Sequence, residues 1–102
     1  MKKSLMDDLK RVKKVLEKDG FIIDGVFGSV SRDEEKDHSD IDILYSINQK
    51  FLDKYGSFKA FKKLEEIKDF LKTQLKRDVD LAPKNNLSNS AKKYILKDMV
   101  HV

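Results

Sequence analysis

The chain has 102 residues, of which 39% are apolar and 39% charged, and its formal net charge is +4 at pH 7. This length suits one domain with a modest core, so a single domain over residues 1–102 is expected. The absence of cysteine and the presence of only two histidines exclude disulfide scaffolds, thiolate zinc sites, cysteine nucleophiles and histidine-based metal cages. No apolar run approaches the roughly 20 residues that span a bilayer, and none follows the N-terminal lysines. A cytoplasmic protein without a membrane partner is therefore expected.

The first part of the chain predicts a helix, a strand and a loop. Residues 4–19 have the helical period, with Ser4 as the expected cap and Gly20 in the turn that follows. The apolar residues of this helix share one face: Leu5, Leu9, Val12, Val15 and Leu16. The β-branched run 21–27 predicts a strand that leads into a turn over 28–31. Residues 31–39 are polar and aperiodic, which indicates a loop or one helical turn followed by a loop.

The remainder predicts two short strands, a long helix and a final helix. Residues 41–45 are typical of a strand, residues 48–56 of irregular chain, and residues 57–75 of a helix capped by Ser57. One stripe of that helix is expected to face the core: Phe58, Phe61, Leu64, Ile67, Leu71 and Leu75. A strand over 79–82 stops at Pro83, and a turn over 85–90 follows. The last helix, 91–99, is expected to bury Tyr94, Ile95 and Met99, and residues 100–102 form a closing strand or a frayed end.

This order of elements predicts an α+β (α/β) fold with a small mixed β-sheet flanked by helices and covered mainly on one face. The charge is unevenly distributed over it. Residues 28–42 include six acidic and two basic residues, which gives this segment a formal charge of −4. The rest of the chain therefore carries +8. Charge alone leaves a solvated acidic loop and an acidic functional site equally open.

The pair Asp40 and Asp42 carries the first chemical signal. In a strand, residues two apart point to the same side with Cα atoms about 6.5 Å apart. Like charges held this close repel one another unless a cation compensates, and Mg²⁺ prefers oxygen ligands. Chance supplies about 1.5 Asp-x-Asp pairs in this composition. The chain has two, so either pair in isolation is better explained as solvated surface charge.

The two residues of the second pair, Asp78 and Asp80, have different neighbours in the sequence and therefore different expected roles. Asp80 stands between Val79 and Leu81 in a strand that ends at Pro83, so its side chain belongs to the sheet's other face. If that strand lies beside residues 41–45, Asp80 joins the first pair in one cluster. Asp78 follows Lys76 and Arg77 and is better explained as a surface ion pair.

A glycine–serine corner precedes the acidic pair. Gly28 would allow a phosphate to approach the backbone closely, and Ser29 offers a hydroxyl and an N–H. An ordinary turn at the end of a strand explains the dipeptide alone better. The spacings of the P-loop, the Rossmann fingerprint and the EF-hand are all absent.

Taken together, Gly28-Ser29, ten residues, Asp40-Ile41-Asp42 and the later Asp80 resemble the minimal nucleotidyltransferases of the polymerase-β superfamily. Arg32 matches the family's Gly-Ser-x-x-Arg, Ser39 matches its Ser-Asp-x-Asp, and residues 77–81 resemble its third-carboxylate strand. One departure is Asp33, where the family often has glycine after the arginine, and it leaves open whether activity is impaired.

The resemblance implies a nucleotidyltransferase fold, two Mg²⁺ ions and ATP as substrate. It implies that Asp40 and Asp42 bridge both metals and that Asp80 completes the site of the metal that activates the acceptor hydroxyl. Nucleotide binding is implied for Gly28, Ser29, Arg32 and Ser39. Arg32 is explained equally well by a loop ion pair with Asp33 or Glu35.

Short members of this family are commonly encoded with a HEPN-domain ribonuclease as a toxin–antitoxin pair. The implied function is an antitoxin that transfers AMP from ATP to a tyrosine of the toxin. The alternative is a non-catalytic module that neutralises its partner by occlusion. Antibiotic or RNA nucleotidyl transfer is a weaker third reading, since no aromatic–basic pattern for nucleic acid stands out. The acceptor, the nucleotide base and self-association stay open.

Overall fold

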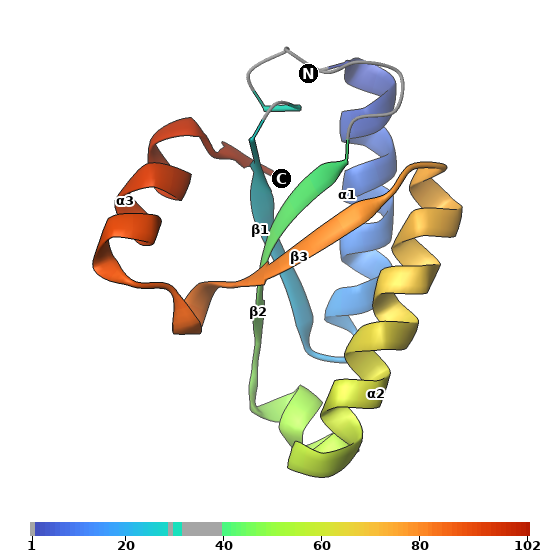
Figure 1. Ribbon diagram of the computed structural model, residues 1–102. Coiled ribbons are helices and arrows are strands. Elements are labelled where there is room, and N and C mark those ends of the chain that lie inside the picture. The colour runs from blue at the N-terminus through green and yellow to red at the C-terminus, as the bar shows by residue number, and fades with distance from the viewer. Residues whose placement is uncertain (1, 29, 32–39) are drawn as a thin grey trace.

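The computed structural model describes residues 2–28, 30–31 and 40–102 (Figure 1). In chain order, the elements are α1 (Lys3–Glu17), β1 (Phe21–Phe27), β2 (Ile41–Ile47), α2 (Gln49–Leu75), β3 (Val79–Pro83), a 3₁₀ turn (Lys84–Asn86), α3 (Asn89–Asp98) and β4 (Val100–His101). The predicted order of these elements is confirmed, and the C-terminus closes the sheet as β4. Nearly all of the loop predicted over 31–39 lies outside the described residues. No helix in these ranges is long and apolar enough to cross a membrane.

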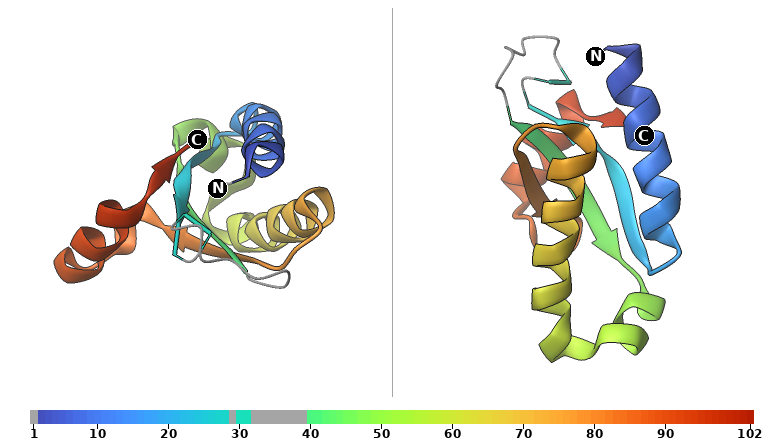
Figure 2. Two further views of the ribbon diagram at one scale, coloured as in Figure 1. Left: turned by 90° about the horizontal axis from the view of Figure 1, so that it is seen from above. Right: turned by 90° about the vertical axis from the view of Figure 1, so that its right-hand side faces the viewer.

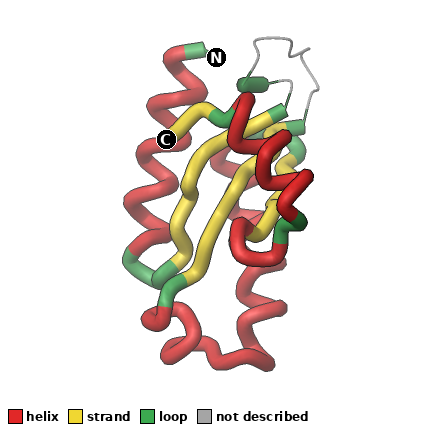
Figure 3. The backbone as a smooth tube through the Cα atoms, turned by 90° about the vertical axis from the view of Figure 1, so that its left-hand side faces the viewer, coloured by secondary structure: helices red, strands yellow, loops and turns green. Residues whose placement is uncertain are grey.

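The described strands form a four-stranded sheet in the order β3-β2-β1-β4. β1 is antiparallel to β2 and β4, whereas β2 and β3 run parallel, so the sheet is mixed as predicted. α1 and α2 cover one face, and α3 lies on the opposite side (Figure 2). Figure 3, viewed from the side of α3, shows this helix in front of the strands.

The hydrophobic core lies between the sheet and the helices α1 and α2. Alternate residues of β2 point into it, and so do residues of the neighbouring strand β1: Ile41, Ile43 and Tyr45 from β2, and Phe21, Ile23 and Val26 from β1. Val26 is the register partner of Ile43, and Ile23 is that of Tyr45. The rings of Phe21 and Tyr45 stack with centroids 4.8 Å apart. A register shift between Ile23 and Gly25 breaks the alternation of β1 and returns Val26 to the core side. The residues between these core positions on β2 are left for the opposite face.

Three predictions about the helices α1 and α3 are wrong. α1 begins at Lys3 after Lys2, so Ser4 lies inside the helix and does not cap it. Val15 is 46% exposed, because the contact with the sheet is filled by the other four predicted positions of α1. Tyr94 is 67% exposed, since α3 packs on the body of the protein mainly through Ile95.

The start of α2 differs most from the prediction. Residues 49–55 are helical because the Asn48 side chain accepts a hydrogen bond from the Phe51 backbone N–H, at 3.3 Å, and caps the first turn. Gly56, with φ +63° and ψ −176°, interrupts the helix, which then continues close to the predicted start at Ser57. Figure 1 shows this first part of α2 below the ends of the strands.

The core stripe of α2 also begins later than predicted. Phe58 is 96% exposed and Phe61 is 73% exposed, so neither belongs to the core. The stripe instead begins at Ala60, which is buried, and continues through the remaining predicted positions: Leu64, Ile67, Leu71 and Leu75. Because the first turns of α2 extend past the sheet, nothing in the described chain covers the two phenylalanines.

Candidate active site

Asp42 and Asp80 face each other across the parallel pair β2–β3. The two residues are direct register partners, and neighbouring strands lie about 5 Å apart. Their chain neighbours Ile41, Ile43 and Val79 are buried in the core. Because side chains alternate along a strand, both carboxylates belong to the opposite face of the sheet, on the side of α3. Asp42 is half-buried and Asp80 is exposed.

The same end of the sheet holds Asp40. This exposed residue directly precedes β2. The next residue, Ile41, donates its backbone N–H to the carbonyl oxygen of Asp78 at 2.9 Å, which fixes the starts of β2 and β3 side by side. The Asp78 side chain points elsewhere and lies 3.9 Å from the Lys72 Nζ, which confirms a surface ion pair there.

Gly28 packs directly against the carboxylate of Asp42. It follows β1, whose last residue, Phe27, is the register partner of Asp42. Gly28 has φ +77°, and a Cβ atom at this position would clash with Oδ2 of Asp42 and lie 3.3 Å from its Cγ. Ser31 donates its hydroxyl to the carbonyl oxygen of Gly28 at 2.8 Å and holds the turn. Glycine is therefore required here both by the backbone conformation and by the carboxylate beside it.

The structure thus brings together Gly28, Asp42 and Asp80, with Asp40 at the entrance of β2. The other predicted nucleotide-binding residues, Ser29, Arg32 and Ser39, lie outside the described residues. Within the described part of the chain, no three carboxylate or imidazole groups gather closely enough to form a ready-made metal cage. The arrangement is a pair of facing carboxylates with a third nearby.

This donor set fits a divalent metal ion of the magnesium type. Carboxylate oxygens are the ligands that hard cations prefer, and two facing carboxylates repel each other until a cation lies between them. The missing side chain at Gly28 lets the Asp42 carboxylate lie directly against the backbone at this corner.

Asp24 is a half-buried polar residue that belongs to none of the sequence motifs. Asp24 lies at the register shift of β1, and its Oδ2 atom is buried with no hydrogen-bond partner among the described residues. Buried polar atoms nearly always have a partner, so this oxygen marks a strained or functional point of the strand. The signal was present in the sequence as a carboxylate inside the apolar run 21–27.

Comparisons with known proteins identify the family and support the fold. The family model described as "Nucleotidyltransferase domain" matches residues 9–102. A Methanocaldococcus jannaschii protein named "Putative protein adenylyltransferase" is 33% identical over 95% of this chain and 100% of its own length. "Protein adenylyltransferase MntA" of Thermococcus cleftensis is 33% identical over 76% of this chain and 71% of that protein. A solved structure described as a "putative minimal nucleotidyltransferase" superposes with a TM-score of 0.76 at 21% identity, covering 97% of this chain and 93% of that one, which supports the fold.

Proposed function

The chain belongs to the nucleotidyltransferase domain family, and from that premise we propose that it is a protein adenylyltransferase that moves AMP from ATP to a hydroxyl of another protein. The observation that carries the proposal is the pairing of Asp42 with Asp80, next to a glycine that has room for no side chain. Relatives that match most of this chain are named as protein adenylyltransferases, which supports a protein as the acceptor.

In this proposal, Asp40, Asp42 and Asp80 hold two Mg²⁺ ions. When bound, such a pair of ions neutralises the charge that develops on the attacking and leaving oxygens of an in-line displacement. Asp42 is the fixed ligand, because β2 is paired on both sides and Gly28 confines its carboxylate. Asp80 is the more exposed of the pair and lies on an edge strand, so it faces the side from which a protein hydroxyl can arrive.

The nucleotide is proposed to bind at the corner after β1. Gly28 leaves its backbone accessible to the triphosphate, and the resemblance adds Ser29, Arg32 and Ser39 as further nucleotide-binding residues. The acceptor oxygen forms a bond to the α-phosphorus, the bond from that phosphorus to the bridging oxygen breaks, and pyrophosphate leaves. The acceptor hydroxyl loses its proton to solvent in the same step.

The acceptor is proposed to be a tyrosine of a HEPN-domain toxin, which would make this chain its antitoxin. In this proposal the partner supplies much of the recognition of the acceptor. Neutralisation by simple occlusion of the toxin remains the competing function, and it predicts that ATP is not needed.

Labelled transfer tests the proposal directly. The purified chain is incubated with ATP labelled at the α-phosphate, Mg²⁺ and a HEPN-domain protein as the candidate acceptor. We expect Asp42→Asn and Asp80→Asn each to lower the rate of labelling by about 10²-fold or more, because each removes a metal ligand. Asp78→Asn is the matched control, since its side chain makes a surface ion pair, and it should change the rate less than about twofold.

Two outcomes would contradict the proposal. Label transfer that survives Asp42→Asn would remove this site from the chemistry. Neutralisation of the partner without ATP, with no label on either protein, would favour occlusion.

A further inference from the structure

The first turns of α2 expose apolar side chains that no other part of the described chain covers. Phe58 is 96% exposed, Phe61 is 73% exposed and Leu52 is 39% exposed. Single exposed apolar residues are common on protein surfaces, but neighbouring large ones indicate a binding surface. These residues lie at the end of the molecule opposite the aspartate pair.

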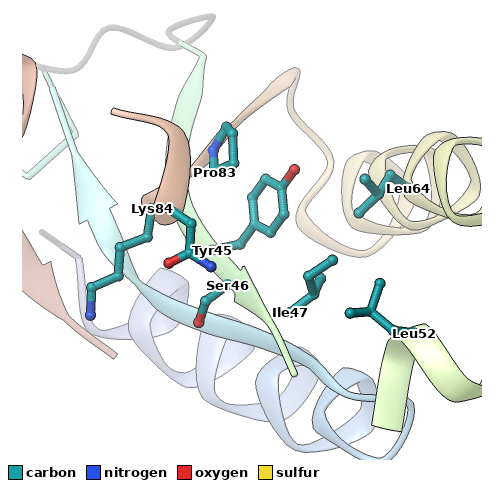
Figure 4. Close-up of a pocket in the computed structure, with 8 residues that line it drawn as sticks. Tyr45, Ser46, Ile47, Leu52, Leu64, Pro83 and Lys84 are labelled. Carbon is teal, nitrogen blue, oxygen red and sulfur yellow. The ribbon is translucent and has the colours of Figure 1, made fainter. Parts of the chain in front are cut away.

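The exposed phenylalanines continue into a groove. Phe58, Phe61 and Leu64 are spaced three residues apart on α2 and so lie along one row of the helix. Leu64 also lines a groove of about 370 Å³ at the end of β2, together with Leu52. Figure 4 shows that Leu52 and Leu64 of α2 face the strand residues across this groove, namely Tyr45, Ile47 and Pro83. Its walls on this side are therefore apolar.

Lysines surround this apolar row. Residues 50–63 contain five lysines and one acidic residue, Asp53, a formal charge of +4. Lys54 is paired with Asp19, and Lys63 lies 3.9 Å from Glu66. In the described part of the chain, no carboxylate lies within 4.0 Å of the other three lysines of this stretch: Lys50, Lys59 and Lys62.

A second groove of about 350 Å³ runs along the same helix. Tyr55, Lys59, Lys62, Lys63 and Glu66 line it, so lysines predominate among its polar groups. The apolar row and this basic groove are therefore neighbours on the first half of α2. We call the two together the α2 docking surface, made of Leu52, Phe58, Phe61 and Leu64 with Lys59 and Lys62.

We propose that the α2 docking surface binds an acidic amphipathic segment of another protein. The apolar side chains of that segment fill the groove beside Leu52 and Leu64 and pack on the two phenylalanines, while its carboxylates meet Lys59 and Lys62. A second copy of this chain is disfavoured, because a symmetric contact would bring the same lysines against each other. Exposed phenylalanines beside lysines can also stack nucleic-acid bases, so a nucleic acid is the competing occupant. The aliphatic groove residues Leu52, Leu64 and Ile47 favour the apolar side chains of a protein segment.

This docking surface is separate from the proposed chemistry. Tyr45 is the groove residue of β2 nearest to Asp42, about 10 Å along the strand, and its side chain points to the core whereas Asp42 belongs to the opposite face of the sheet. A segment bound at Ile47 therefore leaves the aspartate pair open. The inference goes beyond the proposed function and does not require it, because it depends only on the apolar and charged groups of α2.

Fluorescence anisotropy with a synthetic probe tests the inference. The probe is a labelled helical peptide of about 16 residues with leucines at helical spacing and glutamates elsewhere, and its lysine counterpart serves as the charge control. We expect the glutamate peptide to bind and the lysine peptide not to bind. The variant Phe58→Ser/Phe61→Ser should raise the dissociation constant at least about tenfold, because both side chains lie in the proposed contact.

The matched control is Tyr94→Ser/Leu96→Ser, which removes two exposed apolar side chains from α3. It should leave the dissociation constant unchanged within about twofold. Both double variants change exposed residues, so circular dichroism should show the same folded spectrum as the wild type. The variant Asp42→Asn should bind the peptide as the wild type does, which keeps this test independent of catalysis.

Three results would overturn the inference. The first is no saturable binding of the glutamate peptide, or equal binding by the Phe58→Ser/Phe61→Ser variant. The second is tighter binding of a single-stranded oligouridylate of about 12 nucleotides than of the peptide, which would make the surface a nucleic-acid site. The third is a dimer in sedimentation that the same variant abolishes, which would assign the surface to a second copy of the chain.

Discussion

The two ends of β2 differ in the chemical character of the residues around them. At its start, Asp42 lies between Asp80 and Gly28, on the face that α1 and α2 leave uncovered. At its end, Tyr45 and Ile47 line an apolar groove with residues of α2. The first end holds negative charge that a bound cation would neutralise, and the second holds apolar surface that another protein would cover. In the two proposals made above, one strand would serve two kinds of recognition, because its core-facing residues anchor it between them.

The beginning of helix α2 allows the sharpest test of how a buried and an exposed phenylalanine differ in their contribution to stability. Phe51 is fully buried, whereas Phe58 is almost fully exposed. We expect Phe51→Ala to lower the free energy of unfolding by about 3–5 kcal/mol, because it leaves a large cavity in the core. Phe58→Ala should change it by less than about 0.5 kcal/mol. Urea unfolding monitored by circular dichroism measures both, and equal losses would show that Phe58 is buried in solution.

Metal binding distinguishes the start of β2 from its end. Mg²⁺ or Mn²⁺ should raise the melting temperature of the wild type, because the ion binds the folded state and relieves the repulsion between Asp42 and Asp80. Asp42→Asn should lose most of this rise, whereas Asp78→Asn should keep it. Differential scanning fluorimetry with and without the metal shows the effect, and an equal shift in all three proteins would place the ion elsewhere.

Gly28 and Gly56 form a natural pair for testing the glycine beside the site. Both have positive φ, but a Cβ at Gly28 would clash with Asp42, whereas a Cβ at Gly56 would meet nothing within 4 Å. Each alanine substitution should cost about 1 kcal/mol of stability from the backbone conformation. Only Gly28→Ala should also slow AMP transfer, by at least about tenfold, because it displaces a metal ligand. Equal transfer rates in the two variants would show that Asp42 is not confined by Gly28.

The smallest expected effect concerns the ion pair that ties the start of α2 to the turn before β1. The Lys54 ammonium donates to Asp19 and holds the pKa of that carboxyl below its ordinary value of 3.8. Because the folded-state pKa is the lower one, the pair stabilises the fold above the ordinary pKa and loses this contribution as the pH falls through the folded-state value.

The same carboxylate raises the pKa of Lys54 above 10.5, so the contribution of the lysine is lost as the pH rises through that raised value. Urea midpoints from pH 6 down to pH 3 should therefore fall less steeply for Asp19→Asn than for the wild type. Parallel slopes in the two proteins would show that the pair does not form in solution.

Much of the candidate site follows from local patterns in the sequence. The strand over residues 21–27 and the alternation around Asp42 and Asp80 are visible in the order of apolar and charged residues. The parallel register that makes these two residues partners is a property of the fold, and no local pattern contains it. The contact between Gly28 and the Asp42 carboxylate is likewise not contained in a local pattern, because it is made between the end of β1 and a residue of β2.

The errors on α2 have a physical origin as well. Phe58 and Phe61 continue the helical period of the core stripe, so the period alone predicts their burial. Burial also requires a surface to pack against. The first turns of α2 extend past the ends of the strands, so the sheet offers these two side chains no such surface. The helical segment over 49–55 directly follows Asn48, whose side chain caps it. Asparagine is a common N-cap residue, so this signal is present in the sequence although the prediction of irregular chain does not use it.

The most direct test of the central claim is crystallography of the chain with Mn²⁺ and a non-hydrolysable ATP analogue, using anomalous scattering to locate the metal. The account predicts a manganese peak at about 2.2 Å from carboxylate oxygens of both Asp42 and Asp80, and no such peak in Asp42→Asn crystals. A peak bound elsewhere, or one that persists between these residues after the Asp42→Asn substitution, would contradict it.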